Sequence, residues 1–272
     1  MNFKEMKCAT LHKPIPARGF TLVEVLVVVC ILVVLAVISF SSGKAMLTRA
    51  RIIESTSNLR SLAVANVVYA SDSGAFCPAA DQFNNRRWHG ARSSNGSKFD
   101  PTLGFLSPYL GKSMQVTQCP LFHVMLDGSS SFEDGSGGYG YNATYIGGRP
   151  GGEFDPKTKI LISEKLSNIR NPSRTIMFTT AAYARVGGLQ ESAYCEPPYP
   201  DFGEGPAGQR LSPTVHFRAN GKALVAWCDG SVTAESKTEA SAGDNPHGGD
   251  ADQWNLGWCG PEANNGWWNP KN

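Results

Sequence analysis

Residues 20–40 read FTLVEVLVVVCILVVLAVISF, and the organisation of the whole chain follows from this stretch. Only Thr21, Glu24 and Ser39 interrupt its apolar residues. At a rise of about 1.5 Å per residue, a helix over this stretch is roughly 30 Å long, which matches the hydrocarbon core of a bilayer. The stretch therefore predicts a membrane-spanning helix over residues 20–42.

The residues before this stretch are basic. They include four basic residues, Lys4, Lys7, Lys13 and Arg18, and only one acidic residue, Glu5. Because basic flanks stay in the cytoplasm, we expect a cytoplasmic N-terminus and export of the rest of the chain. The whole chain has 25 Lys and Arg against 23 Asp and Glu, a formal charge of +2, so the excess positive charge lies mostly in this flank.

The composition of the chain excludes two classes of protein. A charged fraction of 18% is too low for a disordered tail, and there is no basic block of the kind that binds nucleic acid. The 29 glycines and 17 prolines predict many turns and little helix beyond the first segment.

Three kinds of N-terminal segment contain an apolar stretch of this sort. A secretory signal has a shorter apolar region followed by a small-x-small cleavage site, and residues 39–43 offer no clean site. A plain membrane anchor fits the length but leaves Glu24 unexplained, because a carboxylate inside a bilayer costs about a few kcal/mol. The third kind accounts for the flank, the length and Glu24 together.

The basic flank and the apolar stretch meet in the run RGFTLVE, residues 18–24. This run resembles the signal of type IV prepilins, which type IV pilins share with the pseudopilins of type II secretion. The resemblance implies that prepilin peptidase cuts between Gly19 and Phe20 and methylates the new N-terminus. It also implies that Glu24 acts in assembly by pairing with the terminal amine of a neighbouring subunit. Burying a carboxylate beside a cation is far less costly than burying it alone.

The helix continues past the apolar stretch. Apolar or small residues recur at helical spacing, and residues 71–74, Ser-Asp-Ser-Gly, predict the helix end. We expect one helix from about Thr21 to Ala70, with residues 43–74 as a stem that packs on a sheet formed by the rest of the chain. The stripe that would pack there comprises Met46, Ile52, Ile53, Thr56, Leu59, Leu62, Ala63, Asn66, Val67 and Ala70.

Further motifs resemble a group of pseudopilin-like proteins that combine a prepilin signal with a C-terminal His…Asp-Gly motif. NLR at residues 58–60, GYGYN at residues 138–142 and NPSRTIMF at residues 171–178 match this group. His216 and the pair Asp229-Gly230 match its C-terminal motif, with a longer gap between them than the group's commonest form.

We interpret these motif residues as structural. A strand end where glycines allow packed tyrosines to approach the backbone explains GYGYN, and a ligand-facing loop is the alternative. A His–carboxylate pair needs a nucleophile or a metal to be catalytic, and the chain has no motif of a serine hydrolase, zinc protease or dithiol site. We therefore expect no enzymatic activity. The residues with predicted structural roles are Tyr139, Tyr141, Asn142, His216, Asp229 and Gly230.

Strands are predicted at residues 159–162 and, more clearly, at residues 175–180. Residues 213–235 predict a three-stranded antiparallel meander. Asn220-Gly221 and Asp229-Gly230 separate its short apolar runs, and both dipeptides are preferred in two-residue hairpin turns because they tolerate positive φ.

Seven cysteines occur, of which Cys8 and Cys30 precede the exported region. An oxidising compartment makes disulfides plausible for the others. Their odd number leaves at least one thiol free unless chains pair with one another, and the sequence does not choose the pairing. Their spacing is too wide to favour zinc. The candidate disulfide cysteines are Cys77, Cys119, Cys195, Cys228 and Cys259.

The C-terminal tail supplies two further candidate features. Major pseudopilins bind calcium in a C-terminal loop, and Asp244, Asp250 and Asp252, with Asn245, offer oxygen ligands here; a solvated loop is the alternative. The last 19 residues also hold four tryptophans, which either cover the sheet or form a sugar- or protein-binding surface. Those tryptophans are Trp254, Trp258, Trp267 and Trp268.

The sequence therefore predicts an α+β, pilin-like fold: a long N-terminal helix packed on an antiparallel sheet with irregular loops. Its parts are a leader (residues 1–19), a transmembrane and assembly helix (20–42), a helical stem (43–74) and an exported head (75–272). By resemblance it is a subunit of a type II secretion pseudopilus or a pilus, anchored in the bacterial inner membrane with a periplasmic head. Its partners would be prepilin peptidase, other subunits and the inner-membrane assembly platform. We expect no nucleic-acid partner. The alternative is a membrane-anchored module whose head binds a glycan or a protein.

Overall fold

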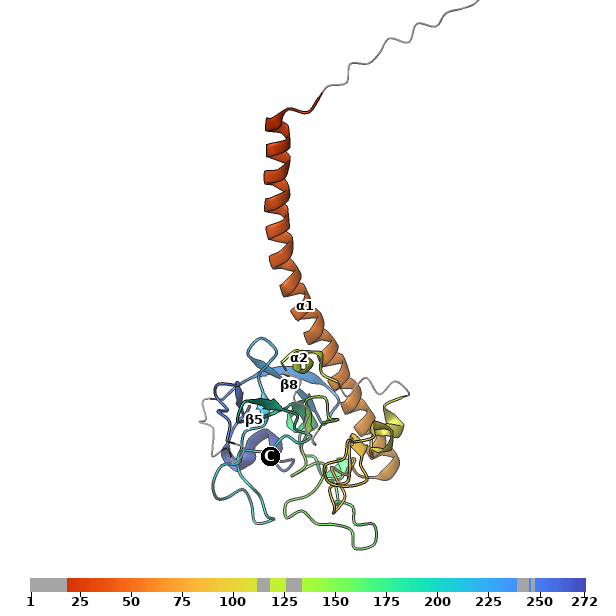
Figure 1. Cartoon of the computed structure of the whole chain (residues 1–272). Helices are drawn as coiled ribbons and strands as arrows, with labels where there is room; N and C mark the ends of the chain where they lie inside the picture. Colours follow the sequence, from red (N-terminus) through yellow and green to blue (C-terminus); the bar gives the residue numbers. More distant parts are fainter. Residues whose placement is uncertain (1–18, 112–117, 126–133, 239–244, 246–247) are drawn as a thin grey trace, which may run out of the picture. The chain divides into compact units, whose positions relative to one another are not determined.

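The computed structural model describes residues 19–111, 118–125, 134–238, 245 and 248–272. The chain divides into two compact units, Met1–Leu47 and Thr48–Asn272. One helix, α1 (Leu22–Ser73), begins in the first unit and ends in the second (Figure 1). The prediction of a single long N-terminal helix is confirmed.

Helix α1 ends where the sequence predicted. Gly74 has a φ of 79°, in the left-handed region that glycine adopts without steric strain. Its N–H donates to the carbonyl of Ala70 at 2.9 Å, which satisfies one of the last carbonyls of the helix. The helix therefore stops at a glycine that both breaks it and caps it.

The stem buries one stripe of α1 in the core of the second unit. Leu59, Leu62 and Ala63 are fully buried there. Ile53, which the sequence placed in the stripe, is 69% exposed. That prediction is wrong because each helical residue turns by about 100°, so Ile53 points away from the side on which the half-buried Ile52 lies.

The main sheet of the second unit is antiparallel and has four strands in the order β3-β4-β8-β9. Among the described residues, three two-stranded sheets accompany it, β1 with β2, β5 with β6 and β7 with β10. The α+β class is confirmed. The strands are β1 (Arg86–Arg87), β2 (Gly90–Ala91), β3 (Tyr139–Tyr141), β4 (Ile176–Thr180), β5 (Tyr183–Arg185), β6 (Gly188–Gln190), β7 (Val215–His216), β8 (Lys222–Trp227), β9 (Val232–Ser236) and β10 (Leu256–Gly257).

Short helical turns connect these strands. One is a single α-turn and the others are 3₁₀ turns, several of which begin at proline, a residue whose fixed φ suits the first helical position. They are α2 (Pro120–His123), η1 (Pro101–Leu103), η2 (Ser107–Tyr109), η4 (Leu166–Asn168), η5 (Pro172–Arg174) and η6 (Ala263–Trp268).

Strand β8 is buried on both faces, and its residues alternate between two cores. Leu224 and Ala226 belong to the larger core, with the stem residues of α1. Val225 and Trp227 belong to a smaller core, with the C-terminal tail. The sheet therefore has the stem on one side and the last part of the tail, from Trp258 to Trp268, on the other.

Asn220-Gly221 forms the predicted two-residue hairpin turn. Both residues have positive φ, 54° and 77°. The N–H of Ala219 donates to the carbonyl of Lys222 at 2.9 Å, and the reverse bond measures 3.2 Å. The turn that joins β8 to β9 differs, because only Gly230 has a positive φ there. It is a longer loop, closed by the bond from the N–H of Trp227 to the carbonyl of Ser231 at 2.9 Å.

The prediction is wrong about the pairing partner of the first strand of the meander. β7 pairs with β10 from the tail, with His216 opposite Leu256, instead of with β8. The backbone after β7 continues this pairing, since the N–H of Phe217 donates to the carbonyl of Asn255 at 3.0 Å. A segment far along the sequence thus takes the hydrogen bonds that the neighbouring strand was expected to fill.

Gly140, in the middle of β3, lies against neighbouring backbone. A Cβ at this position would lie 2.6 Å from the Cβ of Ala181 and 2.7 Å from the carbonyl of Tyr194. Both distances are shorter than real Cβ contacts, and the atoms cannot move without shifting the backbone. Glycine at this position is therefore required by close packing.

We predict that Gly140→Ala lowers the free energy of unfolding of the head by about 1–3 kcal/mol, the usual effect of overpacking a core. Urea unfolding of the purified chain in detergent, followed by tryptophan fluorescence, measures it. Gly43→Ala is the matched control, because the added methyl group meets nothing within 4 Å. Equal stabilities for the two variants would contradict this account of β3.

Candidate processing and assembly site

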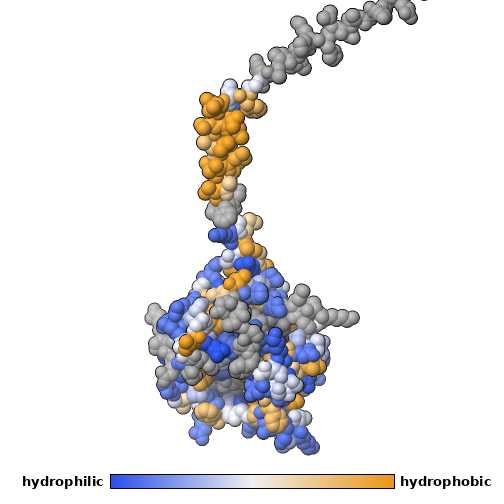
Figure 2. Space-filling model, in the orientation of Figure 1, coloured by the Kyte–Doolittle hydropathy of each residue, from blue (hydrophilic) through white to orange (hydrophobic). Residues whose placement is uncertain are grey.

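The first part of α1 is apolar on every side. Its residues from Leu22 to Ile38 are exposed within the structure, and Figure 2 shows their surface as almost uniformly hydrophobic. By length and composition this helix could cross a membrane. A surface of this kind is stable only in lipid or against other apolar helices.

Helix α1 begins with a reciprocal hydrogen-bonded cap. The hydroxyl of Thr21 accepts from the N–H of Glu24 at 3.3 Å. The carboxylate of Glu24 accepts from the N–H and from the hydroxyl of Thr21, both at 2.8 Å. The carbonyl of Thr21 takes the first helical bond, from Val25 at 3.3 Å. Thr21 is therefore the N-cap and Glu24 the third helical residue of a capping box.

This cap gives the Glu24 carboxylate a place in an otherwise apolar helix. Its negative charge lies at the end of α1 where the helix dipole is positive, which favours an anion. The T-x-x-E spacing of a capping box is readable in the sequence, but sequence reasoning took Glu24 only as an assembly residue. The structure shows that the same carboxylate also fixes where the helix begins.

The Gly19–Phe20 peptide bond lies outside the helix. Both residues are exposed, and the Phe20 side chain is 82% exposed. A Cβ on Gly19 would meet nothing within 4 Å, and its φ is not in the left-handed region. The fold of this chain therefore does not require glycine at position 19, so any requirement for it comes from an enzyme that acts there.

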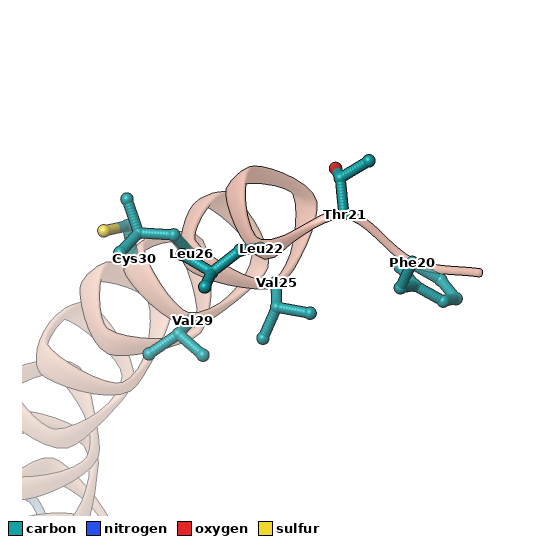
Figure 3. Close-up of a pocket in the computed structure, with 7 residues that line it drawn as sticks. All are labelled: Phe20, Thr21, Leu22, Val25, Leu26, Val29 and Cys30. Atoms are coloured by element: carbon teal, nitrogen blue, oxygen red, sulfur yellow. The ribbon is translucent and has the colours of Figure 1, made fainter.

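A hollow of about 480 Å³ runs along one side of the helix start. Figure 3 shows the ring of Phe20 and the side chains of Val25 and Val29 beside it. Its walls come from the first turns of a single helix and the residues before it, so only part of any occupant would be enclosed. The other lining residues are Thr21, Leu22, Leu26 and Cys30.

Tyr139 and Tyr141 join the stem to the sheet. The hydroxyl of Tyr141 donates to the carbonyl of Cys77 at 2.8 Å and accepts from the side-chain amide of Asn66, in α1, at 3.0 Å. Asn66 also accepts from the N–H of Cys77 at 2.8 Å. The hydroxyl of Tyr139 donates to the carbonyl of Ser55 in α1 at 3.2 Å.

Asn142 makes the corresponding connection to the tail. Its side-chain amide donates to the carbonyl of Ile176 in β4 at 2.9 Å and to that of Trp268 at 3.1 Å. All three motif residues are fully buried. Sequence reasoning did not single out Asn66, although a lone amide inside an apolar stripe was a usable signal.

His216 is buried in β7 and bonded through its ring. Its Nδ1 accepts from the guanidinium of Arg218 at 3.0 Å, because arginine can only donate. Burial, followed by the positive charge of Arg218, lowers the pKa of His216 from 6.5 to about 2. Arg218 also donates to the carbonyl of Gly138, next to Tyr139, so this arginine links the two motif segments.

Asp229 and Gly230 shape a turn. The exposed carboxylate of Asp229 accepts from the N–H of Ser231 at 2.8 Å and from its hydroxyl at 2.6 Å. The φ of Gly230 is 86°. Within the described residues, His216 and Asp229 share no hydrogen bond, so the structure does not bring the two halves of the His…Asp-Gly motif together.

The five cysteines of the head are buried free thiols in the structure. The disulfides stay a prediction. The placement of the cysteines in two different cores limits which of them can pair with each other. Cys77, Cys119 and Cys228 lie in the larger core. Cys195 and Cys259 lie in the smaller one.

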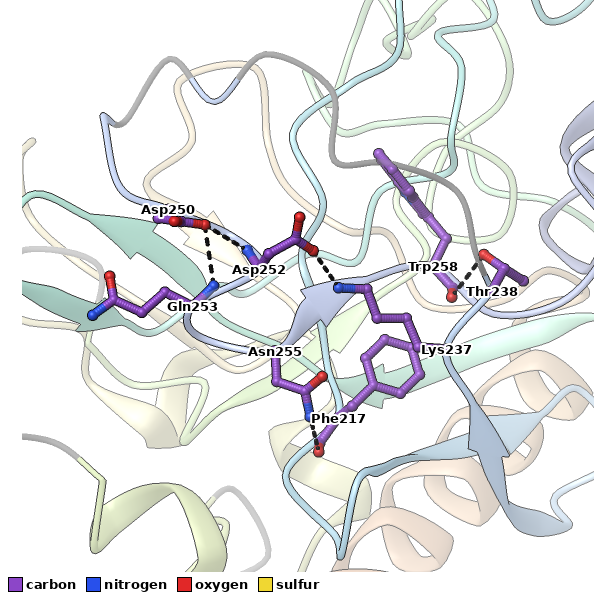
Figure 4. A network of polar contacts seen from close by, with 8 residues as sticks. All are labelled: Phe217, Lys237, Thr238, Asp250, Asp252, Gln253, Asn255 and Trp258. Carbon is purple, nitrogen blue, oxygen red and sulfur yellow. Dashed lines mark hydrogen bonds and ion pairs between the residues drawn. The ribbon is translucent and has the colours of Figure 1, made fainter.

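The carboxylates of Asp250 and Asp252, which were proposed to bind calcium, make contacts with other protein groups (Figure 4). Asp252 pairs with the ammonium of Lys237 at 2.6 Å. Asp250 accepts from the N–H groups of Asp252 and Gln253 at 2.9 and 3.1 Å. Among the described residues no group of three or more His, Cys, Asp or Glu side chains could hold a metal. Asp244 lies outside the described residues, so calcium stays a prediction, without support from this geometry.

The tail tryptophans cover the sheet instead of forming an exposed platform. Trp258 and Trp268 are 1% and 0% exposed and belong to the smaller core. The indole N–H of Trp258 donates to the carbonyl of Glu196 at 3.2 Å. Trp267 is partly buried against the same core, with its ring centre 5.3 Å from that of Trp227.

One family model matches the chain, the prokaryotic N-terminal methylation motif, over residues 16–40. The matched segment contains Gly19, Phe20 and the Thr21–Glu24 cap. No curated protein and no solved structure matches the chain. The match supports a type IV pilin-like subunit that prepilin peptidase processes, with a membrane-anchoring helix, and leaves the type of filament open.

We predict that acid destabilises the head through its buried histidines. Burial, followed by Arg87 and Arg92, also lowers the pKa of His89, from 6.5 to about 3. A histidine that stays neutral in the folded state and protonates when unfolded gives full stability above pH 6.5, and its contribution is lost as pH falls below that value. Each such histidine changes the free energy of unfolding by up to about 1.4 kcal/mol per pH unit.

Urea unfolding between about pH 7 and pH 5 measures this slope. His216→Gln should reduce the slope near pH 5 by about 1.4 kcal/mol per pH unit, whereas the control His123→Gln changes an exposed residue and should leave the wild-type slope. A His216→Gln slope equal to that of wild type would show that His216 is not held neutral.

Proposed function

We propose that this chain is a pilin-like structural subunit, cut by prepilin peptidase between Gly19 and Phe20 and polymerised through α1 into the pseudopilus of a type II secretion system. The observation that carries the proposal is the methylation motif over residues 16–40. Within it, an exposed Gly19–Phe20 bond precedes a helix that is apolar except for its capping carboxylate.

The position of the cleavage bond suits processing. A protease needs an extended, accessible segment, and Gly19 and Phe20 precede the first residue of α1. After cleavage, the new amine of Phe20 would lie one residue before Thr21, whose N–H already donates to Glu24. Methylation keeps this amine basic, so it remains a cation that a carboxylate can pair with.

Assembly then follows from the chemistry of the helix start. Apolar helices can leave the bilayer only if other apolar surfaces replace the lipid. The Glu24 carboxylate gives such packing a fixed register, because an unpaired charge inside the bundle is costly and a pair with a neighbour's terminal amine is far less so. The hollow beside Phe20 offers an apolar surface at the same level of the helix.

The proposed topology puts the leader in the cytoplasm, the helix in the inner membrane and the head in the periplasm. Cleavage removes four basic residues and Glu5 with the leader. The mature chain is then close to neutral, which suits a subunit whose main partners are other subunits rather than a strongly charged ligand.

The alternative, a head that binds a glycan or a protein, has less support. Its main argument was the cluster of tail tryptophans, and Trp258 and Trp268 are buried in the smaller core. Buried indoles cannot stack on a ligand unless the tail opens.

The test expresses the full chain with a prepilin peptidase and the type II assembly machinery, and compares wild type with Gly19→Ala and Glu24→Ala. Gly19→Ala should keep its leader, as shown by intact mass. Glu24→Ala should lose its leader yet assemble poorly. Hydrogen bonds to charged groups contribute about 1.5–3 kcal/mol, so the sedimentable fraction of Glu24→Ala should fall by about tenfold or more.

The control is Val33→Ile, a change in the same apolar segment but outside the hollow, which should leave cleavage and polymer unaffected. Normal cleavage of Gly19→Ala together with normal polymer from Glu24→Ala would overturn the proposal. Glycan or protein binding by a cleaved but non-polymerising wild type would favour the alternative.

A further inference from the structure

The fold sorts the five cysteines of the head into two sets. Successive residues of β8 point to opposite faces of the sheet, so Leu224 lies in the larger core and Val225 in the smaller one. Three cysteines share the larger core with Leu224, and Cys195 and Cys259 share the smaller core with Val225. A disulfide needs its two Cα atoms within about 7 Å, which favours pairing within a core.

Cys195 and Cys259 both lie in the smaller core. Both thiols are buried, with residue exposures of 0% and 1%. The residues next to them are bonded to one another, because the indole of Trp258 donates to the carbonyl of Glu196 at 3.2 Å.

The cysteines of the larger core have other neighbours. The thiol of Cys119 lies 3.3 Å from the hydroxyl of Ser55 in α1. The thiol of Cys77 donates to the carbonyl of Pro78 at 3.3 Å. These contacts hold the two sulfurs at separate points of the stem side and the loop after it, and three thiols on one side leave at least one unpaired.

We propose that Cys195 and Cys259 form a disulfide in the mature head. The inference rests on the proposed function for its setting, an oxidising compartment outside the inner membrane. The two thiols lose two protons and two electrons as the S–S bond forms. A disulfide-bearing thiol oxidase accepts both and is reduced to a dithiol.

The bond would close a long loop that contains β7, β8, β9 and β10. It would hold the last part of the tail, with Trp258 and Trp268, on the face of the sheet opposite the stem. A crosslink of this length restricts the unfolded chain more than the folded one. Burial raises the pKa of both thiols, that of Cys259 to about 12. Since the thiolate is the reactive form, oxidation should accompany folding and be slow in the finished head.

The decisive experiment maps disulfides in the purified full chain. The chain is unfolded and reduced in detergent, refolded with oxidised and reduced glutathione, alkylated with N-ethylmaleimide and digested with trypsin without reduction. Trypsin separates the two cysteines from each other and from the rest, because Arg185 and Arg210 bound the Cys195 peptide and Lys237 and Lys271 bound the Cys259 peptide. We expect one crosslinked species that joins these two peptides.

Two variants supply the stability readout. Cys195→Ala and Cys259→Ala should each abolish the difference in melting temperature between the oxidised and the reduced chain. The control Cys228→Ala should keep both that difference and the crosslinked peptide. Alkylation of both Cys195 and Cys259 in the refolded wild type, or a link from either of them to another cysteine, would overturn the pairing.

This test is independent of export, so its failure differs from failure of the proposed function. Leader cleavage in cells, read from intact mass, tests the function. A cleaved chain that refolds without the link disproves the pairing alone. An uncleaved chain that refolds with the link disproves the function alone.

Discussion

A carboxylate at the start of an apolar helix is the constraint on which the organisation of this chain depends. Glu24 cannot lie free among hydrocarbon at low cost, so it must be satisfied in each environment that the helix enters. In the single chain Thr21 satisfies it through two hydrogen bonds at 2.8 Å, and the same contacts set the first turn of α1. A filament would offer a second solution, a neighbour's terminal amine, and the difference between the two would favour assembly in a single register.

A second group of buried polar contacts makes the head a specific structure at the other end of the same helix. Asn66 of α1 holds the Tyr141 hydroxyl and the N–H of Cys77 at once, and Tyr139 reaches the carbonyl of Ser55. Buried polar groups are costly when unpaired. Only one rotation of the stem about its own axis, and one position along that axis, therefore satisfies all of these hydrogen bonds. With the stem on one face and the last part of the tail on the other, the sheet is covered on both sides.

Local signals in the sequence predicted local structure well. Helical periodicity and Gly74 predicted α1 and its end, and Asn220-Gly221 predicted a two-residue turn, which has positive φ at both positions. Long-range pairing was beyond this reasoning: β7 takes β10 as its partner because a tail residue such as Leu256 competes for the same hydrogen bonds. The division of the cysteines between two cores likewise depends on which face of the sheet each one reaches. At the site, the processing motif was readable in the sequence, whereas the capping role of Glu24 was recognised only in the structure, although its T-x-x-E spacing was present.

The N-terminus of the mature wild-type chain is the most direct test of α1 as an assembly helix. Intact mass and N-terminal peptide mass of the protein purified from cells with prepilin peptidase should show a chain that begins at Phe20 with one methyl group on its amine. A chain that retains residues 1–19, or one that is cut after the apolar stretch near Ser42, would contradict the assignment of α1 as an assembly helix.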